Sequence, residues 1–194
     1  HSIALSLGPN VDREEIFFTS SGSEANQTVI RSVLEPIFQE KSSRDSQPLW
    51  VTTPVEHDSV LQMKSWVEQQ GGRVEMLEVD ESGRVRLDSL DRLLELNPCL
   101  LSVVWVNNET GVVNPISEIS ERVRGSEVRF HIDGAQAWGK LPVSAKEGTT
   151  AHYITFSGHK IGALSGTGVI WNRPGSQISP LIFGKQEKGR RGGT

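Results

Sequence analysis

Short runs of β-branched and aromatic residues alternate along this chain with longer stretches whose apolar residues recur at helical spacing. Such alternation is typical of βαβ units, in which helices connect the parallel strands of one sheet. The pattern therefore predicts an α/β fold with a largely parallel, seven-stranded sheet. The predicted strands are residues 16–19, 49–53, 74–79, 100–106, 128–132, 153–156 and 168–171.

Helices are predicted where apolar-periodic stretches are bounded by capping and breaking residues. They cover residues 2–7, 23–40, 57–70, 87–96 and 116–123. Between them, we expect a polar surface loop at 41–47, a turn at 80–83 and a tail without periodicity at 184–194. Both ends of the chain are abrupt, so we expect a domain that is truncated at both ends.

Length and composition restrict the class of protein. The 194 residues are enough for one sizeable core, so a single domain spanning residues 1–194 is expected. A net charge of −4 disfavours a nucleic-acid partner. Apolar runs such as 99–106 are too short to cross a bilayer and no leader opens the chain, so a cytoplasmic protein without a membrane partner is expected. Cys99, the single cysteine, is predicted to pack in a strand rather than to form a disulfide.

Ligands of open parallel sheets bind outside the carboxyl ends of the strands. After the first predicted strand, the turn at 19–24 leads into a helix. Gly22 would allow close backbone approach, Ser23 supplies a hydroxyl, and the helix N-terminus would attract an anion. The alternative is an ordinary helix N-cap at Ser23. The turn contains neither the lysine of a P-loop nor a GxGxxG pattern.

Two further strands end in polar residues. His57 follows the second predicted strand, where its ring could stack on an aromatic cofactor or move protons, or could simply be a surface residue at a helix N-terminus. Asn107 and Asn108 follow the fourth predicted strand. These amides could build a turn, or Asn108 could donate to a phenolic oxygen or a substrate carboxylate.

The fifth and sixth predicted strands end in an acid and a lysine. Asp133 would be costly to desolvate unless it met a cation such as a protonated pyridine nitrogen, although it could instead cap a helix. Gln136, one helical turn further, would point to the same side. Lys160 follows Ser157 and His159, and its amine becomes a nucleophile if desolvation or a nearby cation lowers its pKa. These turns share one edge of the predicted sheet, which indicates a single cofactor site.

Six stretches in this order resemble a known family across almost the whole chain. They are residues 17–26 (FFTSSGSEAN), 55–57 (VEH), 107–111 (NNETG), 131–136 (HIDGAQ), 157–160 (SGHK) and 189–194 (GRRGGT). The chain is similar to the pyridoxal 5′-phosphate (PLP) enzymes of the class V aminotransferase group, and most closely to cysteine desulfurases of the NifS and IscS type. The resemblance implies the three-layer α/β/α large domain of a PLP-dependent transferase, with most of a small domain absent.

The resemblance also implies roles for individual residues. Lys160 and His57 would be catalytic: Lys160 carries the cofactor as a Schiff base and moves the substrate's α-proton, and His57 stacks on the cofactor ring. Asp133 would keep the pyridine nitrogen protonated, so that the cofactor acts as an electron sink. Gln136 would bond the ring's phenolic oxygen. Asn108 would lie nearby and also face the substrate carboxylate.

A phosphate site and a dimer are implied in the same way. Gly22, Ser23, Ser157 and His159 resemble the residues that hold the cofactor phosphate. In the family, the final threonine of the last motif reaches the phosphate of the other subunit's cofactor. Thr194 therefore implies a homodimer with active sites at the subunit interface.

The reaction implied is the removal of sulfur from L-cysteine, which leaves alanine and a persulfide on a cysteine of the enzyme. The sulfur would pass to an acceptor protein, as in iron–sulfur cluster assembly. The persulfide cysteine and the substrate-binding arginine of the family are expected downstream of Thr194, and Cys99 is not assigned the persulfide role.

Other functions remain open at this point. Within the family, a selenocysteine lyase or an enzyme acting on another amino acid would retain the same motifs. From other classes, the candidates are an inactive dimerisation domain and a dinucleotide-binding module, the second disfavoured by the missing glycine spacing. A metal site is not expected, because the chain has one cysteine and its histidines are scattered at residues 1, 57, 131, 152 and 159.

Overall fold

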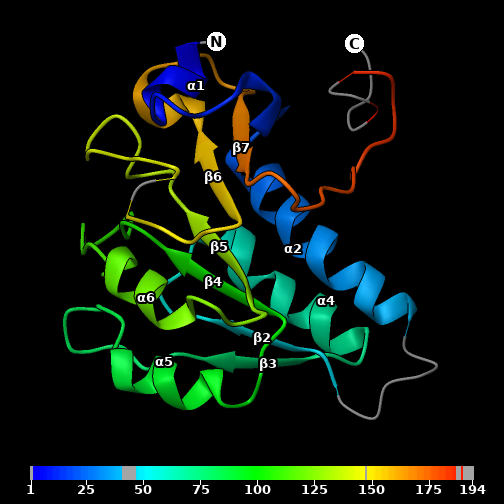
Figure 1. The fold of residues 1–194 in the computed structure, drawn as a ribbon, viewed down its shortest axis with the longest axis vertical. Coiled ribbons are helices and arrows are strands. Elements are labelled where there is room, and N and C mark those ends of the chain that lie inside the picture. Colours follow the sequence, from blue (N-terminus) through cyan, green and yellow to red (C-terminus); the bar gives the residue numbers. More distant parts are fainter. Residues whose placement is uncertain (1, 41–46, 147, 187–188, 190–194) are drawn as a thin grey trace.

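The computed structural model describes residues 2–40, 47–146, 148–186 and 189, and its centre is one seven-stranded sheet (Figure 1). The strand order is β1-β7-β6-β5-β4-β2-β3. The strands are β1 (Ile16–Thr19), β2 (Leu49–Thr52), β3 (Arg73–Met76), β4 (Leu100–Val104), β5 (Arg129–Asp133), β6 (Tyr153–Ser157) and β7 (Gly168–Asn172). The predicted fold class and each of the predicted strands are confirmed, with shifted ends.

Strand direction is the main addition to the predicted sheet. β7 pairs antiparallel with both β1 and β6, whereas β2, β3, β4, β5 and β6 form parallel pairs. β1 therefore runs in the same direction as the five parallel strands. β3 and β4 end earlier than predicted, because Val79 and Val106 form only isolated bridges, with Val85 and Val113 respectively.

Helices cover both faces of the sheet (Figure 1). They are α1 (Ser2–Ser6), α2 (Gly22–Gln39), α3 (Asp58–Leu61), α4 (Met63–Gln69), α5 (Leu87–Leu94) and α6 (Ile116–Val123). The helix predicted at 57–70 is divided at Gln62, and the others lie where they were predicted. Parts of the predicted loop at 41–47 and of the predicted tail at 184–194 fall outside the described residues.

Two apolar cores separate the three layers. Leu100 belongs to a core that includes residues of α2, α3 and α4, whereas its neighbour Leu101 belongs to a core that includes residues of α1, α5 and α6. Ile170 and Trp171 divide between the same two cores. Successive side chains of a strand point to opposite faces, so a strand buried on both faces reads as a continuous apolar run. This is why the strand sequences show little alternation.

The topology places one set of loops at one edge of the sheet. Because β1, β2, β4, β5 and β6 run in the same direction, their carboxyl ends meet at this edge. Cys99 precedes β4 and therefore lies at the opposite edge, where its Sγ is 3.0 Å from the carbonyl oxygen of Leu49. Among the described residues, no helix is both long and apolar enough to span a bilayer.

Candidate active site

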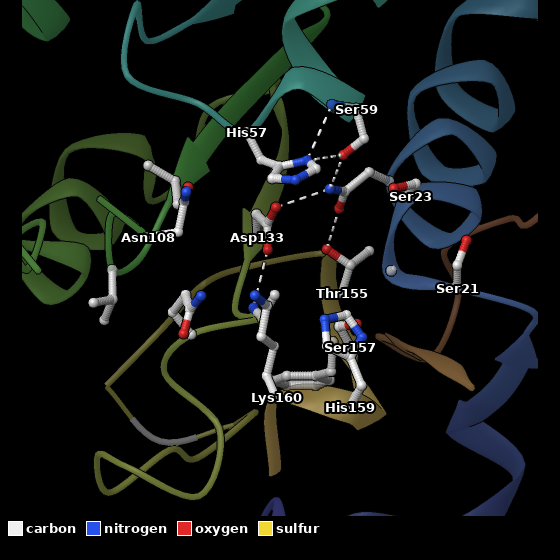
Figure 2. Close-up of a pocket in the computed structure, with 17 residues that line it drawn as sticks. Ser21, Ser23, His57, Ser59, Asn108, Asp133, Thr155, Ser157, His159 and Lys160 are labelled. Carbon is white, nitrogen blue, oxygen red and sulfur yellow. Dashed lines mark hydrogen bonds between the residues drawn. The ribbon is translucent and has the colours of Figure 1, made fainter. Parts of the chain in front are cut away.

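A pocket opens at the carboxyl edge of the sheet, and it is lined by residues that follow five different strands (Figure 2). The predicted site residues that line it are Gly22, Ser23, His57, Asn108, Asp133, Gln136, Ser157, His159 and Lys160. Thr194 lies outside the described residues. The parallel strands thus bring together side chains that are far apart in the sequence.

The N-terminus of α2 forms one wall of the pocket. Ser21 is the N-cap, and its Oγ accepts a hydrogen bond from the backbone N–H of Glu24 at 3.0 Å. The alternative of an N-cap at Ser23 is therefore wrong, since Ser23 lies in the first turn and is exposed to the pocket. A Cβ on Gly22 would lie 2.9 Å from the Cβ of Ser157, so only glycine lets the helix approach β6 this closely.

Asp133 ends β5 at the floor of the pocket and is 3% exposed. Its Oδ1 accepts from the backbone N–H of Ala135 at 2.9 Å, and its Oδ2 accepts from Asn26 Nδ2 at 2.8 Å. Burial raises the pKa of Asp133, while these two hydrogen bonds and the nearby ring of His57 oppose the rise. A cation in the pocket would offset the remaining desolvation.

His57 is both the N-cap of α3 and part of the pocket wall. Its Nδ1 accepts from the backbone N–H of Ser59 at 3.1 Å and lies 2.8 Å from Ser59 Oγ. The sequence left two alternatives for His57, a surface position at a helix N-terminus or a position in the cofactor site. In the structure, His57 caps α3 and also lines the pocket.

Lys160 lies in the 3₁₀ turn Gly158–Ile161, which follows β6 directly. Its side chain is exposed and lines the pocket on the side of Asp133 that faces away from His57 (Figure 2). Beside it, Ser157 Oγ and His159 Nδ1 are 2.9 Å apart. An amine, a hydroxyl and an imidazole therefore share one short segment.

Two roles were open for the asparagines after β4, building a turn or facing the ligand, and each asparagine is placed for one of them. Asn107 builds the turn: its Oδ1 accepts from the backbone N–H groups of Glu109 and Thr110 at 2.9 and 2.8 Å. Asn108 is exposed and lines the pocket. Gln136 also lines it, and its Oε1 accepts from Lys140 Nζ.

Four residues beneath the pocket were not predicted as site residues: Asn26, Glu56, Ser59 and Thr155. Asn26, Ser59 and Thr155 line the pocket floor, and Glu56 is buried beside Asp133. The signal for Asn26 is a polar side chain, 3% exposed, on the apolar face of α2. Thr155 could have been found from strand pairing, because it stands opposite Asp133 in the β5–β6 register.

These residues fit the three chemically distinct ends of PLP. Lys160 offers an amine to the aldehyde, and the buried carboxyl of Asp133 matches a protonated ring nitrogen. The N-terminus of the 18-residue helix α2, with Ser157 and His159 beside it, is suited to a phosphate.

The fold and the residues around the pocket define the class: an α/β protein of the PLP-dependent transferase type. The class-V aminotransferase family model matches residues 9–188, so the chain belongs to that family. Members of this family are PLP-dependent.

Individual relatives agree with this assignment. The chain is 40% identical over 193 residues to a cysteine desulfurase from Nostoc sp., which covers 99% of this chain. A solved NifS-like protein superposes with a TM-score of 0.89 at 33% identity, over 99% of this chain and 51% of its own. The protein SspA, solved in complex with cysteine, gives a TM-score of 0.89 at 31% identity over 99% of this chain and 54% of its own.

The alignment covers only part of each relative. This chain spans 46% of the Nostoc sp. protein, about half the length of the curated relatives that it matches.

Proposed function

We propose that this chain is the cofactor-binding large domain of a PLP-dependent cysteine desulfurase. The observation that carries the proposal is the placement of Asp133, Lys160 and His57 around one pocket. They come from three separate loops, and each matches a different requirement of the cofactor.

Each pocket residue has a distinct proposed role. Lys160 holds the cofactor aldehyde and then moves a proton at the substrate's α-carbon. His57 stacks on the cofactor ring, and Asp133 holds a proton at the ring nitrogen. When bound, PLP supplies an electron sink for bond cleavage at the substrate. Gln136 donates to the phenolic oxygen, and Asn108 lies where it can also contact the substrate carboxylate.

The phosphate would lie between α2 and the loop after β6. Gly22 permits close approach of the helix, and Ser23, Ser157 and His159 offer hydrogen-bonding groups. The helix N-terminus adds backbone N–H groups and the positive end of the helix dipole. Phosphate binding at this wall would leave the ring nitrogen to be held by Asp133.

In the proposed reaction, the C–S bond of L-cysteine breaks and the sulfur passes to a cysteine thiol of the enzyme. That thiol becomes a persulfide and alanine is released, so no external oxidant or reductant is required. Cys99 is unsuited to accept the sulfur, because it lies at the edge of the sheet opposite the pocket. The relative named as a cysteine desulfurase and the cysteine complex of SspA support this choice of substrate.

We also propose that the protein acts in the cytoplasm as a homodimer, in which Thr194 reaches the partner's cofactor. A sulfur-acceptor protein, as in iron–sulfur cluster assembly, would take up the persulfide sulfur. The resemblance to the NifS-type enzymes supports these assignments. Sedimentation of the natural protein tests the dimer, and a monomer at micromolar concentration would contradict it.

Cofactor binding is tested on the natural protein purified with added PLP. We expect a visible absorption band, and borohydride reduction is expected to fix the cofactor mass on Lys160. The Lys160→Ala variant should lose the fixed mass while keeping the wild-type circular dichroism. A colourless wild-type protein would reject the proposal.

Substrate choice is tested by supplying L-cysteine and L-selenocysteine in separate assays. We expect equal amounts of alanine and persulfide sulfur from L-cysteine. Turnover of selenocysteine alone would replace the proposed activity with that of a selenocysteine lyase.

A further inference from the structure

A line of buried polar side chains runs beneath the pocket, through the interior of the sheet. Trp50 Nε1 donates to Ser102 Oγ at 3.0 Å, and Ser102 Oγ lies 3.2 Å from His131 Nδ1. On its other side, His131 Nε2 lies 3.1 Å from Thr155 Oγ1. Each of these four residues is at most 1% exposed.

The line continues to the pocket and divides at Asn26. Thr155 Oγ1 donates to Asn26 Oδ1 at 2.5 Å. Asn26 Nδ2 donates to Asp133 Oδ2 at 2.8 Å and to Ser59 Oγ at 2.9 Å. Figure 2 shows the bonds that join Thr155, Asp133, Ser59 and His57 in this way.

Donor counting fixes the direction of these bonds. An amide nitrogen has two hydrogens and no acceptor capacity, so Asn26 directs both hydrogens to Asp133 and Ser59. Its oxygen must then face Thr155, whose single hydroxyl hydrogen is used for that bond. His131 Nε2 can therefore contact the Thr155 oxygen only as a donor.

The same count determines the tautomer of His131. Burial lowers the pKa of His131 to about 3, so the ring is neutral near pH 7. A neutral ring with its hydrogen on Nε2 accepts at Nδ1, and the Ser102 hydroxyl must donate there. The Ser102 oxygen remains free to accept from Trp50. Every polar group from Trp50 to Asn26 is thereby satisfied in one direction only.

The second branch fixes the proton of His57. The backbone N–H of Ser59 donates to His57 Nδ1, so this nitrogen is an acceptor. The Ser59 hydroxyl accepts from Asn26 and can donate to the same nitrogen. A neutral His57 therefore carries its hydrogen on Nε2.

We propose that Asn26 is a positioning residue for both Asp133 and His57, and that the chain of bonds starting at Trp50 Nε1, which can only donate, fixes which way its amide faces. If the amide were reversed, its oxygen would face the oxygen of Asp133, and the two acceptors would repel unless the carboxyl were protonated. In the observed direction, Asn26 holds Asp133 as a hydrogen-bond acceptor. The inference rests on the proposed function in one respect, namely that Asp133 and His57 face the cofactor.

The direction of the chain is tested without the cofactor, by ¹⁵N NMR of the histidine ring nitrogens in the natural protein stripped of PLP. We expect the hydrogen of His131 on Nε2, with Nδ1 unprotonated. A hydrogen on Nδ1 would reverse the chain and overturn the inference. Because no cofactor is present, this result is independent of the proposed function.

The positioning role is tested by a double-mutant cycle read out as the dissociation constant of PLP. Thr155→Val removes the hydroxyl at nearly constant volume, and Asn26→Ala removes the branch point. We expect Thr155→Val to weaken PLP binding about tenfold, the size of one lost hydrogen bond. Asn26→Ala should weaken it by at least about tenfold, because it removes the bonds to Asp133 and Ser59. The double variant should bind PLP like Asn26→Ala alone, because both changes break the same chain. A further loss of about tenfold in the double variant would overturn the inference.

Two controls separate positioning from general damage. Thr155→Ser keeps the hydroxyl and should bind PLP within about twofold of the wild type. Ser32→Ala removes another buried hydroxyl of α2, one that donates to the carbonyl of Thr28, and should lose stability without weakening PLP binding. Equal weakening by Ser32→Ala and Thr155→Val would show that the effect is merely structural.

Discussion

Glu56, which follows β2, binds the end of β4 through one hydrogen bond: the backbone N–H of Val104 donates to Glu56 Oε1 at 2.7 Å. Thr53 Oγ1 donates to the same oxygen at 2.8 Å. Among the described residues, none forms a hydrogen bond with Glu56 Oε2, which is buried. Burial raises the pKa of Glu56 to about 8, and the negative charge of Asp133 adds to the rise. Glu56 is therefore a neutral acid at pH 7, placed to connect two strand ends beneath the pocket.

Glu56→Gln is expected to change how stability depends on pH. The folded protein holds the Glu56 proton up to about pH 8, whereas the unfolded chain releases it near pH 4.5. Between these values the folded state binds more protons, so the contribution of Glu56 to the free energy of unfolding falls as pH rises. The maximum slope is about 1.4 kcal/mol per pH unit. Glutamine cannot ionise, so the free energy of unfolding of the variant, relative to that of the wild type, should increase from pH 5 to pH 8.

Urea denaturation at pH 5, 6, 7 and 8 measures this difference. The exposed residue Glu118 provides the matched control, because Glu118→Gln removes one carboxyl at the surface. A stability difference between wild type and Glu56→Gln that is constant across this range would contradict the raised pKa.

The sequence pattern was sufficient for the layers and for most of the pocket. Apolar runs locate strands whatever their direction, and residues such as Asp133 and Lys160 were found because they directly follow such runs. Direction itself is not local, so the antiparallel β7 was not predicted. Ser21, Gly22 and Ser23 are all residues that can cap a helix, and only the backbone conformation shows that Ser21 is the N-cap of α2.

The residues beneath the pocket required three-dimensional information. Asn26 and Asp133 are 107 positions apart in the chain, and no periodicity connects them. His131 and Thr155 resemble ordinary strand residues until the register places both in the same buried network. Polar residues that serve other side chains, rather than the ligand, leave no local pattern.

Gly22→Ala should weaken PLP binding. The new Cβ would lie 2.9 Å from Ser157 Cβ and 3.2 Å from Ser157 Oγ, so the N-terminus of α2 must move away from β6. We expect a loss of stability of about 1–3 kcal/mol, as for other overpacked positions. The dissociation constant of PLP should rise at least about tenfold, because a displaced helix end no longer faces the phosphate. Unchanged PLP binding in a folded Gly22→Ala variant would contradict the proposal that the N-terminus of α2 binds the phosphate.

Asp133→Ala separates binding of the cofactor from its use. The phosphate wall and Lys160 remain in this variant, so PLP should bind within about tenfold of the wild type. Turnover of L-cysteine should fall by at least about a hundredfold, because no carboxylate stabilises a proton on the ring nitrogen. Parallel measurement of kcat and of the PLP dissociation constant tests this, and an equal loss in both would contradict the proposed role.

Gly168→Ala should destabilise the sheet where β1, β7 and β6 meet Ser21, the N-cap of α2. Gly168 opens β7 between Thr19 of β1 and Ser157 of β6. A Cβ there would overlap the carbonyl group of Ser21, and backbone this close cannot yield as a flexible side chain can. Overpacking a core typically lowers the free energy of unfolding by about 1–3 kcal/mol. The loss for Gly168→Ala should lie at or above the upper end of this range.

Gly111→Ala is the comparison that isolates the steric effect at Gly168. Gly111 has a φ of 73°, and a Cβ added to it would meet no heavy atom of the described residues within 4 Å. Its substitution therefore adds only backbone strain, about 1–2 kcal/mol. Thermal or urea unfolding of both variants gives the two costs side by side. If Gly168→Ala proves no more destabilising than Gly111→Ala, then the close crossing of β7 and the Ser21 backbone does not limit the residue at position 168.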